Sequence, residues 1–161
     1  MKERGTHPPL TKMSGKAEFS LDRSLRSFMG YRLRRATGTT QLATIELLEK
    51  FDLRIKGYSV LTVVCDNPGV TQSQIATSLH LDHDDIDAEA TKLKEAGFVL
   101  RSKDPNTKNA INLTATEIGR TVCGSATKAI KDLEQKFLKD FSSDELDLLN
   151  ELLLRLQRGP M

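Results

Sequence analysis

The sequence predicts a mainly α-helical fold with one small β-hairpin. Apolar residues recur at helical spacing over most of the chain, two of the predicted helices are short and only about three residues apart, and two strand-like runs follow them. The 161 residues correspond in size to one domain. We therefore expect a helix-turn-helix followed by a hairpin within a single folded domain.

The N-terminal part is expected to contain a flexible arm and a long helix. Residues 1–18 carry four basic side chains and two consecutive prolines with almost no apolar periodicity, which is typical of a flexible basic arm. From Leu21 to Lys50 the apolar residues follow helical spacing, which predicts one long helix with a bend at Gly38. Such a helix would be about 45 Å long, more than a domain of this size covers by itself. A long first helix therefore favours a dimer.

The middle of the chain carries the helix-turn-helix pattern. A helix over residues 55–65 is expected to end before the Asn-Pro-Gly breaker at 67–69. Thr71 to Gln74 form a capping-box pattern at the start of a short helix that reaches residue 79. Asp82 is a suitable N-cap for a further helix over 82–96, which glycine follows. Two short helices joined in this way indicate a helix-turn-helix.

The remainder of the chain changes its pattern twice. Residues 98–102 and 110–113 are strand-like and flank 104–109, which are rich in turn-forming residues, so a hairpin is expected. A capping-box pattern at 114–117 is expected to begin a long helix with one apolar stripe. After a break at 141–145, the last helix carries more leucines than one face needs. These surplus leucines again favour a dimer interface.

In this order of elements the chain resembles the MarR (multiple antibiotic resistance regulator) family of winged-helix dimers. The resemblance covers about Leu21 to Gln157, and its most specific stretch is Asn67-Pro68-Gly69-Val70-Thr71-Gln72-Ser73-Gln74-Ile75-Ala76. Leu81-Asp82, Gly97-Phe98-Val99 and Leu113-Thr114 follow at the family's spacing. Each piece alone is a weak signal, but their joint order over nearly the whole chain is specific.

The resemblance implies how the chain is divided and what it does. It implies one MarR-like domain over 19–161, with a winged-helix DNA-binding part over 54–113 and dimerisation helices over 19–53 and 114–161. Family members are mostly homodimeric repressors of transcription that bind pseudo-palindromic operators in double-stranded DNA. They release the operator when a small effector, often an aromatic or phenolic acid, binds between the two parts.

The resemblance also implies candidate binding residues. The helix after Thr71 would set its N-terminus against phosphates, helix 82–96 would lie in the major groove, and the hairpin would touch the backbone or the minor groove. The implied DNA-binding residues are Thr71, Gln72, Ser73, His83, Asp84, Asp85, Asp87, Ala88, Thr91, Lys92, Lys103, Lys108 and Asn109. For an effector we expect Phe28, Tyr31 and Tyr58 as pocket wall and Arg35 as the partner of a carboxylate. The alternatives are core packing for the aromatic residues and a solvated helix face for the arginine.

The expected recognition helix departs from the family in charge. Residues 82–89 contain five carboxylates and no Lys or Arg, although Arg to guanine is the commonest specific base contact. The acidic run has a simpler interpretation, in which the carboxylates complement the positive end of a helix. A divalent cation bound by His80, His83, Asp84 and Asp87 is a further alternative. The competing function is a regulator-derived dimer that has lost DNA binding and serves as a protein-interaction or ligand-binding module.

Other function classes have little support in the sequence. The formal net charge is +2, so bulk charge alone does not argue for nucleic-acid binding. Cys65 and Cys123 show no disulfide or zinc spacing, and no Gly-rich phosphate loop or nucleophile–base arrangement is present. We expect no enzyme activity, no cofactor and no metal. No apolar run approaches the roughly 18 residues of a membrane span, and we expect a cytoplasmic protein.

Overall fold

The computed structural model describes residues 21–103 and 110–159, so the arm expected over residues 1–18 lies outside the described residues. The chain forms two compact units, Met1–Ala36 and Thr37–Met161. The first unit contains a 3-10 turn, η1 (Leu25–Ser27), and the first turns of α1 (Met29–Glu49). The second unit contains the rest of α1 and all other helices and strands.

The first helix begins later than its apolar pattern predicts. Phe28 has an extended backbone, and its N–H donates to the carbonyl oxygen of Leu25, which closes η1 as a separate turn. The expectation of one helix from Leu21 is therefore wrong at its start. α1 has 21 residues and continues through Gly38, so it spans about 32 Å at the usual helical rise.

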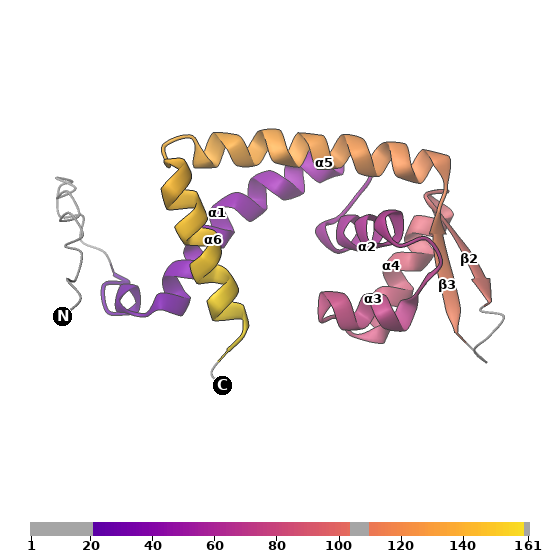
Figure 1. Ribbon diagram of the computed structural model, residues 1–161, viewed down its shortest axis with the longest axis horizontal. Helices are drawn as coiled ribbons and strands as arrows, with labels where there is room; N and C mark the ends of the chain where they lie inside the picture. Colours follow the sequence, from indigo (N-terminus) through magenta and orange to yellow (C-terminus); the bar gives the residue numbers. More distant parts are fainter. Residues whose placement is uncertain (1–20, 104–109, 160–161) are drawn as a thin grey trace, which may run out of the picture. The chain divides into compact units, whose positions relative to one another are not determined.

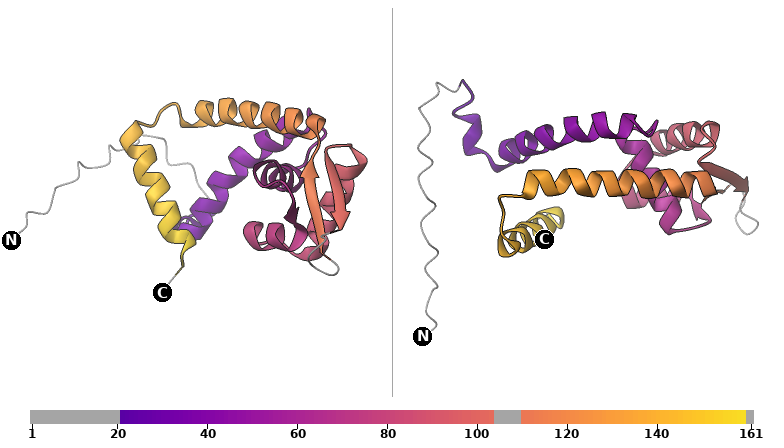
Figure 2. Two further views of the ribbon diagram at one scale, coloured as in Figure 1. Left: turned by 45° about the vertical axis from the view of Figure 1, so that its right-hand side comes forward. Right: turned by 90° about the horizontal axis from the view of Figure 1, so that it is seen from above.

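The second unit contains the predicted helix-turn-helix and hairpin (Figures 1 and 2). Its first helices are α2 (Ile55–Asp66), α3 (Gln72–Leu79) and α4 (His83–Glu95). The hairpin consists of β2 (Val99–Lys103) and β3 (Ile111–Ala115), each shifted by one or two residues from the sequence pattern. The tip of this wing lies outside the described residues, and Lys108 and Asn109 lie there with it.

A third strand was not predicted. β1 (Val70–Thr71) pairs antiparallel with β3, with Val70 opposite Leu113, so the strand order is β1-β3-β2. A strand of two residues is too short to show the alternation by which strands are recognised in a sequence. Its consequence is structural, because β1 fixes the chain just before α3 to the sheet of the wing.

The turns around α3 follow from local hydrogen bonds. The capping box is confirmed: the Gln74 N–H donates to Thr71 Oγ1 at 3.2 Å, and the Thr71 N–H donates to Gln74 Oε1 at 2.9 Å. α3 ends at His80, whose left-handed φ of 51° turns the chain toward α4. Asp82 occupies the N-cap position of α4, but its side chain accepts no capping hydrogen bond.

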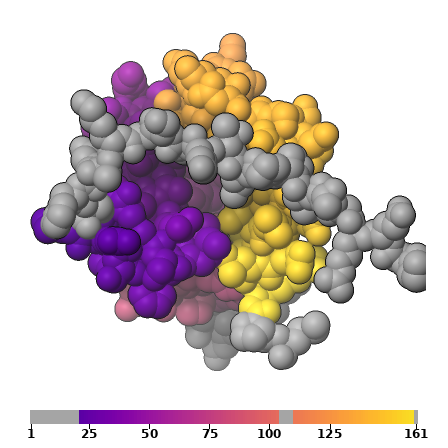
Figure 3. Space-filling model, turned by 90° about the vertical axis from the view of Figure 1, so that its left-hand side faces the viewer, coloured from indigo at the N-terminus to yellow at the C-terminus, as the bar shows by residue number. Residues whose placement is uncertain are grey.

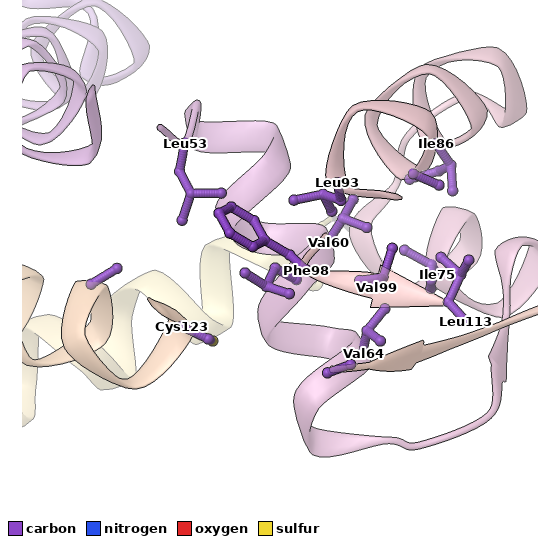
Figure 4. Packing of buried hydrophobic residues seen from close by; sticks show 14 of the residues in the cluster. Leu53, Val60, Val64, Ile75, Ile86, Leu93, Phe98, Val99, Leu113 and Cys123 are labelled. Atoms are coloured by element: carbon purple, nitrogen blue, oxygen red, sulfur yellow. The ribbon is translucent and has the colours of Figure 1, made fainter. Parts of the chain in front are cut away.

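The hydrophobic core lies where the three helices meet the sheet (Figure 4). Its fully buried side chains include Val60 and Val64 of α2, Ile75 of α3, Ile86 of α4 and Leu113 of β3. Leu93, Phe98, Val99 and Cys123 belong to the same cluster. This packing holds α4 by one side only, which leaves its other side available to solvent.

β3 passes into α5 (Glu117–Leu138) through a single residue, Thr116. Thr116 Oγ1 accepts a hydrogen bond from the Gly119 N–H, so Thr116 is the N-cap of α5. The capping pattern expected to start at Thr114 is therefore wrong by two residues, because β3 extends to Ala115. The Thr116 hydroxyl also donates to the Gly97 carbonyl oxygen at 2.7 Å, and the Thr116 N–H donates to the Phe98 carbonyl oxygen at 2.9 Å. The base of the wing and the start of α5 are therefore one hydrogen-bonded joint.

α6 (Ser143–Gln157) carries its leucines on the surface. It begins after the break expected at 141–145 with a capping box between Ser142 and Glu145, and none of its residues is buried. Figure 3 shows this helix, in yellow, at the surface of the molecule. The leucines that are between 37% and 57% exposed are Leu148, Leu149, Leu152, Leu153, Leu154 and Leu156. Within the described residues, no helix has both the length and the apolar character needed to cross a membrane.

Candidate nucleic-acid interface

α4 has one buried side and one exposed side. Ile86, Ala90 and Leu93 are buried, and their spacing of four and three residues places them on one face of the helix. His83, Asp84, Asp87 and Ala88 are exposed, and Thr91 continues this side as a half-buried residue. We call the residues Asp84, Asp87, Ala88 and Thr91 the outer stripe of α4. A helix that is packed by one side and exposes the other has the geometry needed to enter a major groove.

The start of α3 contributes a second polar region. The Thr71 hydroxyl is used in the capping box, and the Gln72 amide nitrogen donates to Asp87 Oδ1 at 3.2 Å. Ser73 is exposed. Of these three predicted residues, two hold the local structure through their side chains, while Ser73 presents its hydroxyl to solvent.

The carboxylates of α4 are largely paired, which the sequence did not show. Asp85 Oδ2 lies 2.7 Å from Lys56 Nζ of α2, and Glu89 Oε1 lies 2.7 Å from Lys92 Nζ. Asp87 is paired with Arg101 of β2. Asp82 and Asp84 form no ion pair within the described part of the chain. The charge that α4 presents is therefore less negative than a count of its acidic residues indicates.

Asp87 is the centre of a contact between three elements. The Arg101 Nη2 atom donates to Asp87 Oδ1, and Arg101 Nη1 donates to Thr91 Oγ1 at 3.0 Å. The hydrogen bonds from Arg101 and Gln72 hold the pKa of Asp87 below its usual range, because they stabilise the ionised carboxylate. We call Gln72, Asp87, Thr91 and Arg101 the Asp87 clamp. It joins α3, α4 and β2.

Arg101 was missed in the sequence, although a signal for it was present. The guanidinium-bearing side chain is only 21% exposed. Side chains alternate along β2, so Arg101 shares a face with the buried Val99 rather than with the exposed Leu100. Strand alternation therefore predicts a cation turned toward α4, where carboxylates are abundant.

Glu89 is the buried charged residue of α4. It is 8% exposed, and a Cβ added at Gly57 in the first turn of α2 would lie 3.1 Å from Glu89 Oε2. A carboxylate at the start of a helix is favoured by the helix dipole. Glu89 therefore belongs to the packing of α4 against α2 and not to the exposed surface.

A cavity of about 680 Å³ lies next to Glu89, between the end of α1, the start of α2 and α4. Its apolar wall includes Ile45, Leu53 and Ile55, and Arg54 and Lys92 add positive charge. Lys92 was predicted as a DNA-binding residue, and the structure places it at this cavity and in contact with Glu89. Lys103, at the end of β2, is exposed.

The residues predicted for an effector have partners within their own units. In the first unit the Tyr31 hydroxyl donates to Asp22 Oδ2 at 2.7 Å, and Arg35 Nη1 lies 3.0 Å from the same oxygen. Phe28 is 63% exposed. In the second unit, the Tyr58 hydroxyl lies 2.9 Å from the Thr127 hydroxyl of α5. The Arg35 guanidinium is thus held by an internal carboxylate.

The described residues contain no group of three or more His, Cys, Asp or Glu side chains arranged to hold a metal ion. Asp87, one of the residues considered for a divalent cation, is bound by Arg101 and Gln72 instead. Its carboxylate is therefore occupied by protein donors.

Comparisons with known proteins agree with this geometry. No family model matches the chain. A protein of Thauera aromatica proposed to regulate the hcr operon is 27% identical over 140 residues, which are 84% of this chain and 82% of that protein. A MarR-family transcriptional regulator from Rhodococcus sp. RHA1 superposes with a TM-score of 0.74 and 25% identity, over 86% of this chain and 96% of that structure.

The transcriptional repressor CouR, solved on a 23-mer DNA duplex, superposes with a TM-score of 0.79 at 25% identity. The match covers 84% of this chain and 96% of that one. CouR from Rhodococcus jostii RHA1 has also been solved bound to p-coumaroyl-CoA. Both complexes are properties of CouR.

The fold and the exposed stripe beside a hairpin define a winged helix-turn-helix protein. Within that class, the chain has the fold of the MarR-family regulators, and its sequence relatives are helix-turn-helix transcriptional regulators. The resemblance seen in the sequence is confirmed.

Proposed function

We propose that the protein is a DNA-binding transcriptional regulator that acts as a homodimeric, ligand-responsive repressor. The observation that carries this proposal is the outer stripe of α4, which the core leaves exposed next to the wing. CouR, which shares this fold, binds a DNA duplex. The activity proposed here is binding, and no catalytic step is part of it.

The proposed contacts follow from the position of each residue. α4 would lie in the major groove with His83, Asp84, Ala88 and Thr91 nearest the bases. Ser73 and the start of α3 would face phosphates, which helix N-termini favour. The wing, with Lys103 at the end of β2 and Lys108 and Asn109 beyond it, would follow the backbone or the minor groove.

An acidic side chain in a groove restricts the bases that it accepts. Asp84 carries no hydrogen-bond donor when ionised, so it matches the cytosine N4 or adenine N6 amino group and opposes guanine O6 and N7. Its repulsion from phosphates lowers affinity for any duplex. We therefore propose that this helix favours selectivity over non-specific affinity.

A dimer would supply a second recognition helix for the second half-site of an operator. We propose that residues 54–113 form the DNA-binding part and that helices within 19–53 and 114–161 dimerise. The exposed leucines of α6 support this division, since contiguous apolar surface on a helix marks an interaction site. Two recognition helices about one DNA turn apart then match a pseudo-palindromic operator.

The effector proposed for this regulator is a small aromatic or phenolic acid. CouR binds p-coumaroyl-CoA, a phenolic acyl compound. In this chain Phe28, Tyr31, Arg35 and Tyr58 are the proposed ligand residues, and an effector carboxylate would compete with Asp22 for Arg35. Binding would lower operator affinity by changing the separation of the two recognition helices.

The test is binding of the purified full chain to the DNA upstream of its own coding sequence. Fluorescence anisotropy across a salt series would compare that duplex with a scrambled duplex of equal length and composition. Selective binding that weakens linearly with the logarithm of salt concentration supports the proposal. Equal binding of both duplexes, or none, contradicts it.

One observation favours a second function. Asp82 and Asp84 form no ion pair in the described residues, and they line an open depression of about 480 Å³ with His83 and Asp85. An acidic surface of this kind suits a basic protein partner better than a phosphate backbone. If no duplex binds at low salt, this interaction module becomes the preferred function.

A further inference from the structure

We propose that Asp87 is a positioning residue for DNA recognition, which holds the wing and the start of α3 in register with the recognition helix. The inference deepens the proposed function and rests on it. In the simple charge count, Asp87 is one of five carboxylates that repel DNA. Its contacts instead assign it a supporting role.

The contacts of Asp87 reach every element that would approach DNA. One of its carboxylate oxygens, Oδ1, accepts hydrogen bonds from Arg101 of β2 and from Gln72 of α3. Arg101 also donates to Thr91, one helical turn further along α4. A planar guanidinium held at two points has a fixed orientation, so the direction of β2 relative to α4 is fixed with it.

The burial of Arg101 distinguishes this pair from the neighbouring ion pair of α4. The Arg101 side chain is 21% exposed although its partner Asp87 is 59% exposed, whereas Lys56 and Asp85, which form the neighbouring pair, are 49% and 42% exposed. Surface pairs contribute little, while a charge-assisted bond to a sheltered guanidinium is stronger and more directional. The loss of Asp87 would also leave Arg101 without its carboxylate partner.

Asp84 provides a matched control on the same helix. It lies three residues before Asp87 on the outer stripe, it is exposed, and it forms no ion pair in the described residues. Asp84→Asn and Asp87→Asn each remove one negative charge from the same surface. If charge alone governs binding, both substitutions raise DNA affinity. If Asp87 positions the wing, the two substitutions have opposite effects.

The experiment uses duplexes selected by the wild-type protein from a random library, with scrambled duplexes as the non-specific probe. Asp84→Asn keeps an acceptor oxygen for the cytosine or adenine amino group and loses only the charge, so we expect it to raise affinity for both duplexes severalfold. We expect Asp87→Asn to lower affinity for the selected duplex at least tenfold and to leave the scrambled duplex unchanged or bound more tightly. All measurements are made well below the melting temperature of each variant.

A rescue variant separates positioning from general destabilisation. The double variant Asp87→Arg with Arg101→Asp has the net charge of the wild type and restores an ion pair between α4 and β2. We expect hydrogen exchange at residues 99–103 to be faster in Asp87→Asn than in the wild type. In the double variant we expect this exchange to be slow again and the preference for the selected duplex to be recovered.

The outcomes distinguish this inference from the proposed function. If the wild type selects no duplex, the proposed function is overturned, and the inference with it. If the wild type selects a duplex but Asp87→Asn binds it as tightly as Asp84→Asn does, only the positioning role is overturned. Unchanged hydrogen exchange at 99–103 in Asp87→Asn overturns it as well.

Discussion

Gly119 shows how closely α5 approaches the wing. A Cβ at this position would lie 2.0 Å from the Phe98 carbonyl oxygen and 2.8 Å from its carbonyl carbon. Both are backbone atoms held by hydrogen bonds from Thr116, so they cannot move aside. The absence of a side chain is therefore a condition for the joint between α5 and the hairpin.

We predict that Gly119→Ala destabilises the protein by about 3 kcal/mol, the upper end of the usual cost of overpacking. Gly124→Ala is the control, because Gly124 lies in the same helix with open space around its Cβ position. Removing a helical glycine there should stabilise by about 0.5–1 kcal/mol. Urea unfolding followed by circular dichroism measures both. Equal effects of the two substitutions would contradict the close approach.

Cys65 is the residue with the largest resolved pKa change. Burial, and secondarily the Cys123 thiol beside it, raise the pKa of Cys65 to about 12 from its ordinary value of 9.0. Because only the thiolate reacts, the reactive fraction at pH 8 is about a thousandfold lower than for an ordinary cysteine. A pKa raised this far favours a packing role for Cys65 over a redox role.

We predict that iodoacetamide modifies Cys65 about a thousandfold more slowly in the native protein at pH 8 than in the urea-unfolded chain. Mass spectrometry of the peptide that contains Cys65 measures the rates. The raised pKa also makes the free energy of unfolding depend on pH. The stabilising contribution of the protonated Cys65 thiol is complete below pH 9 and is lost as pH rises from about 9 toward 12. Comparable native and unfolded rates would show that the thiol is not sheltered.

At the scale of the element, α4 was predicted well in its position and poorly in its charge. Its buried residues Ile86, Ala90 and Leu93 follow helical spacing, because burial on one helix depends on the order of residues along it. Its ion pairs were not predicted, since Lys56 and Arg101 reach α4 from distant parts of the sequence. The same reason explains β1, which is too short to be recognised without its partner β3.

We predict that Asp84→Arg raises non-specific DNA affinity and makes its salt dependence steeper, by about one unit of slope for each new phosphate contact. Asp85→Ser is expected to act in the same direction, and it also releases Lys56 from its ion pair. Anisotropy titrations between low and physiological salt measure the slope. If neither variant changes the slope, this helix does not face DNA.

At the scale of the whole molecule, the predicted association of two chains depends on exposed helices. The sequence indicated a dimer from the surplus leucines of α6, and these leucines are exposed in the structure. The effector contacts stay a prediction, and the predicted residues Phe28, Tyr31 and Arg35 lie in one unit and Tyr58 in the other. The spacing of residues along a chain does not show whether side chains far apart in the sequence contact the same ligand.

We predict that Leu152→Glu weakens the dimer, since a charge would be buried among the leucines of α6. Sedimentation velocity at micromolar concentration should show the mass fall toward that of a single chain, 17.9 kDa. Asn150→Glu places the same charge on another side of the helix and should leave the dimer intact. A dimer that tolerates Leu152→Glu would locate the interface outside this leucine surface.

The joint at Thr116 couples the direction of α5 to that of the wing. One residue separates β3 from α5, and its hydroxyl and N–H donate hydrogen bonds to the carbonyl oxygens of Gly97 and Phe98, so the connection is short and hydrogen-bonded on both sides. The 22 residues of α5 form an arm about 33 Å long. For an α5 that moves as a rigid rod, a sideways displacement of about 3 Å at its far end corresponds to a rotation of the wing by about 5°.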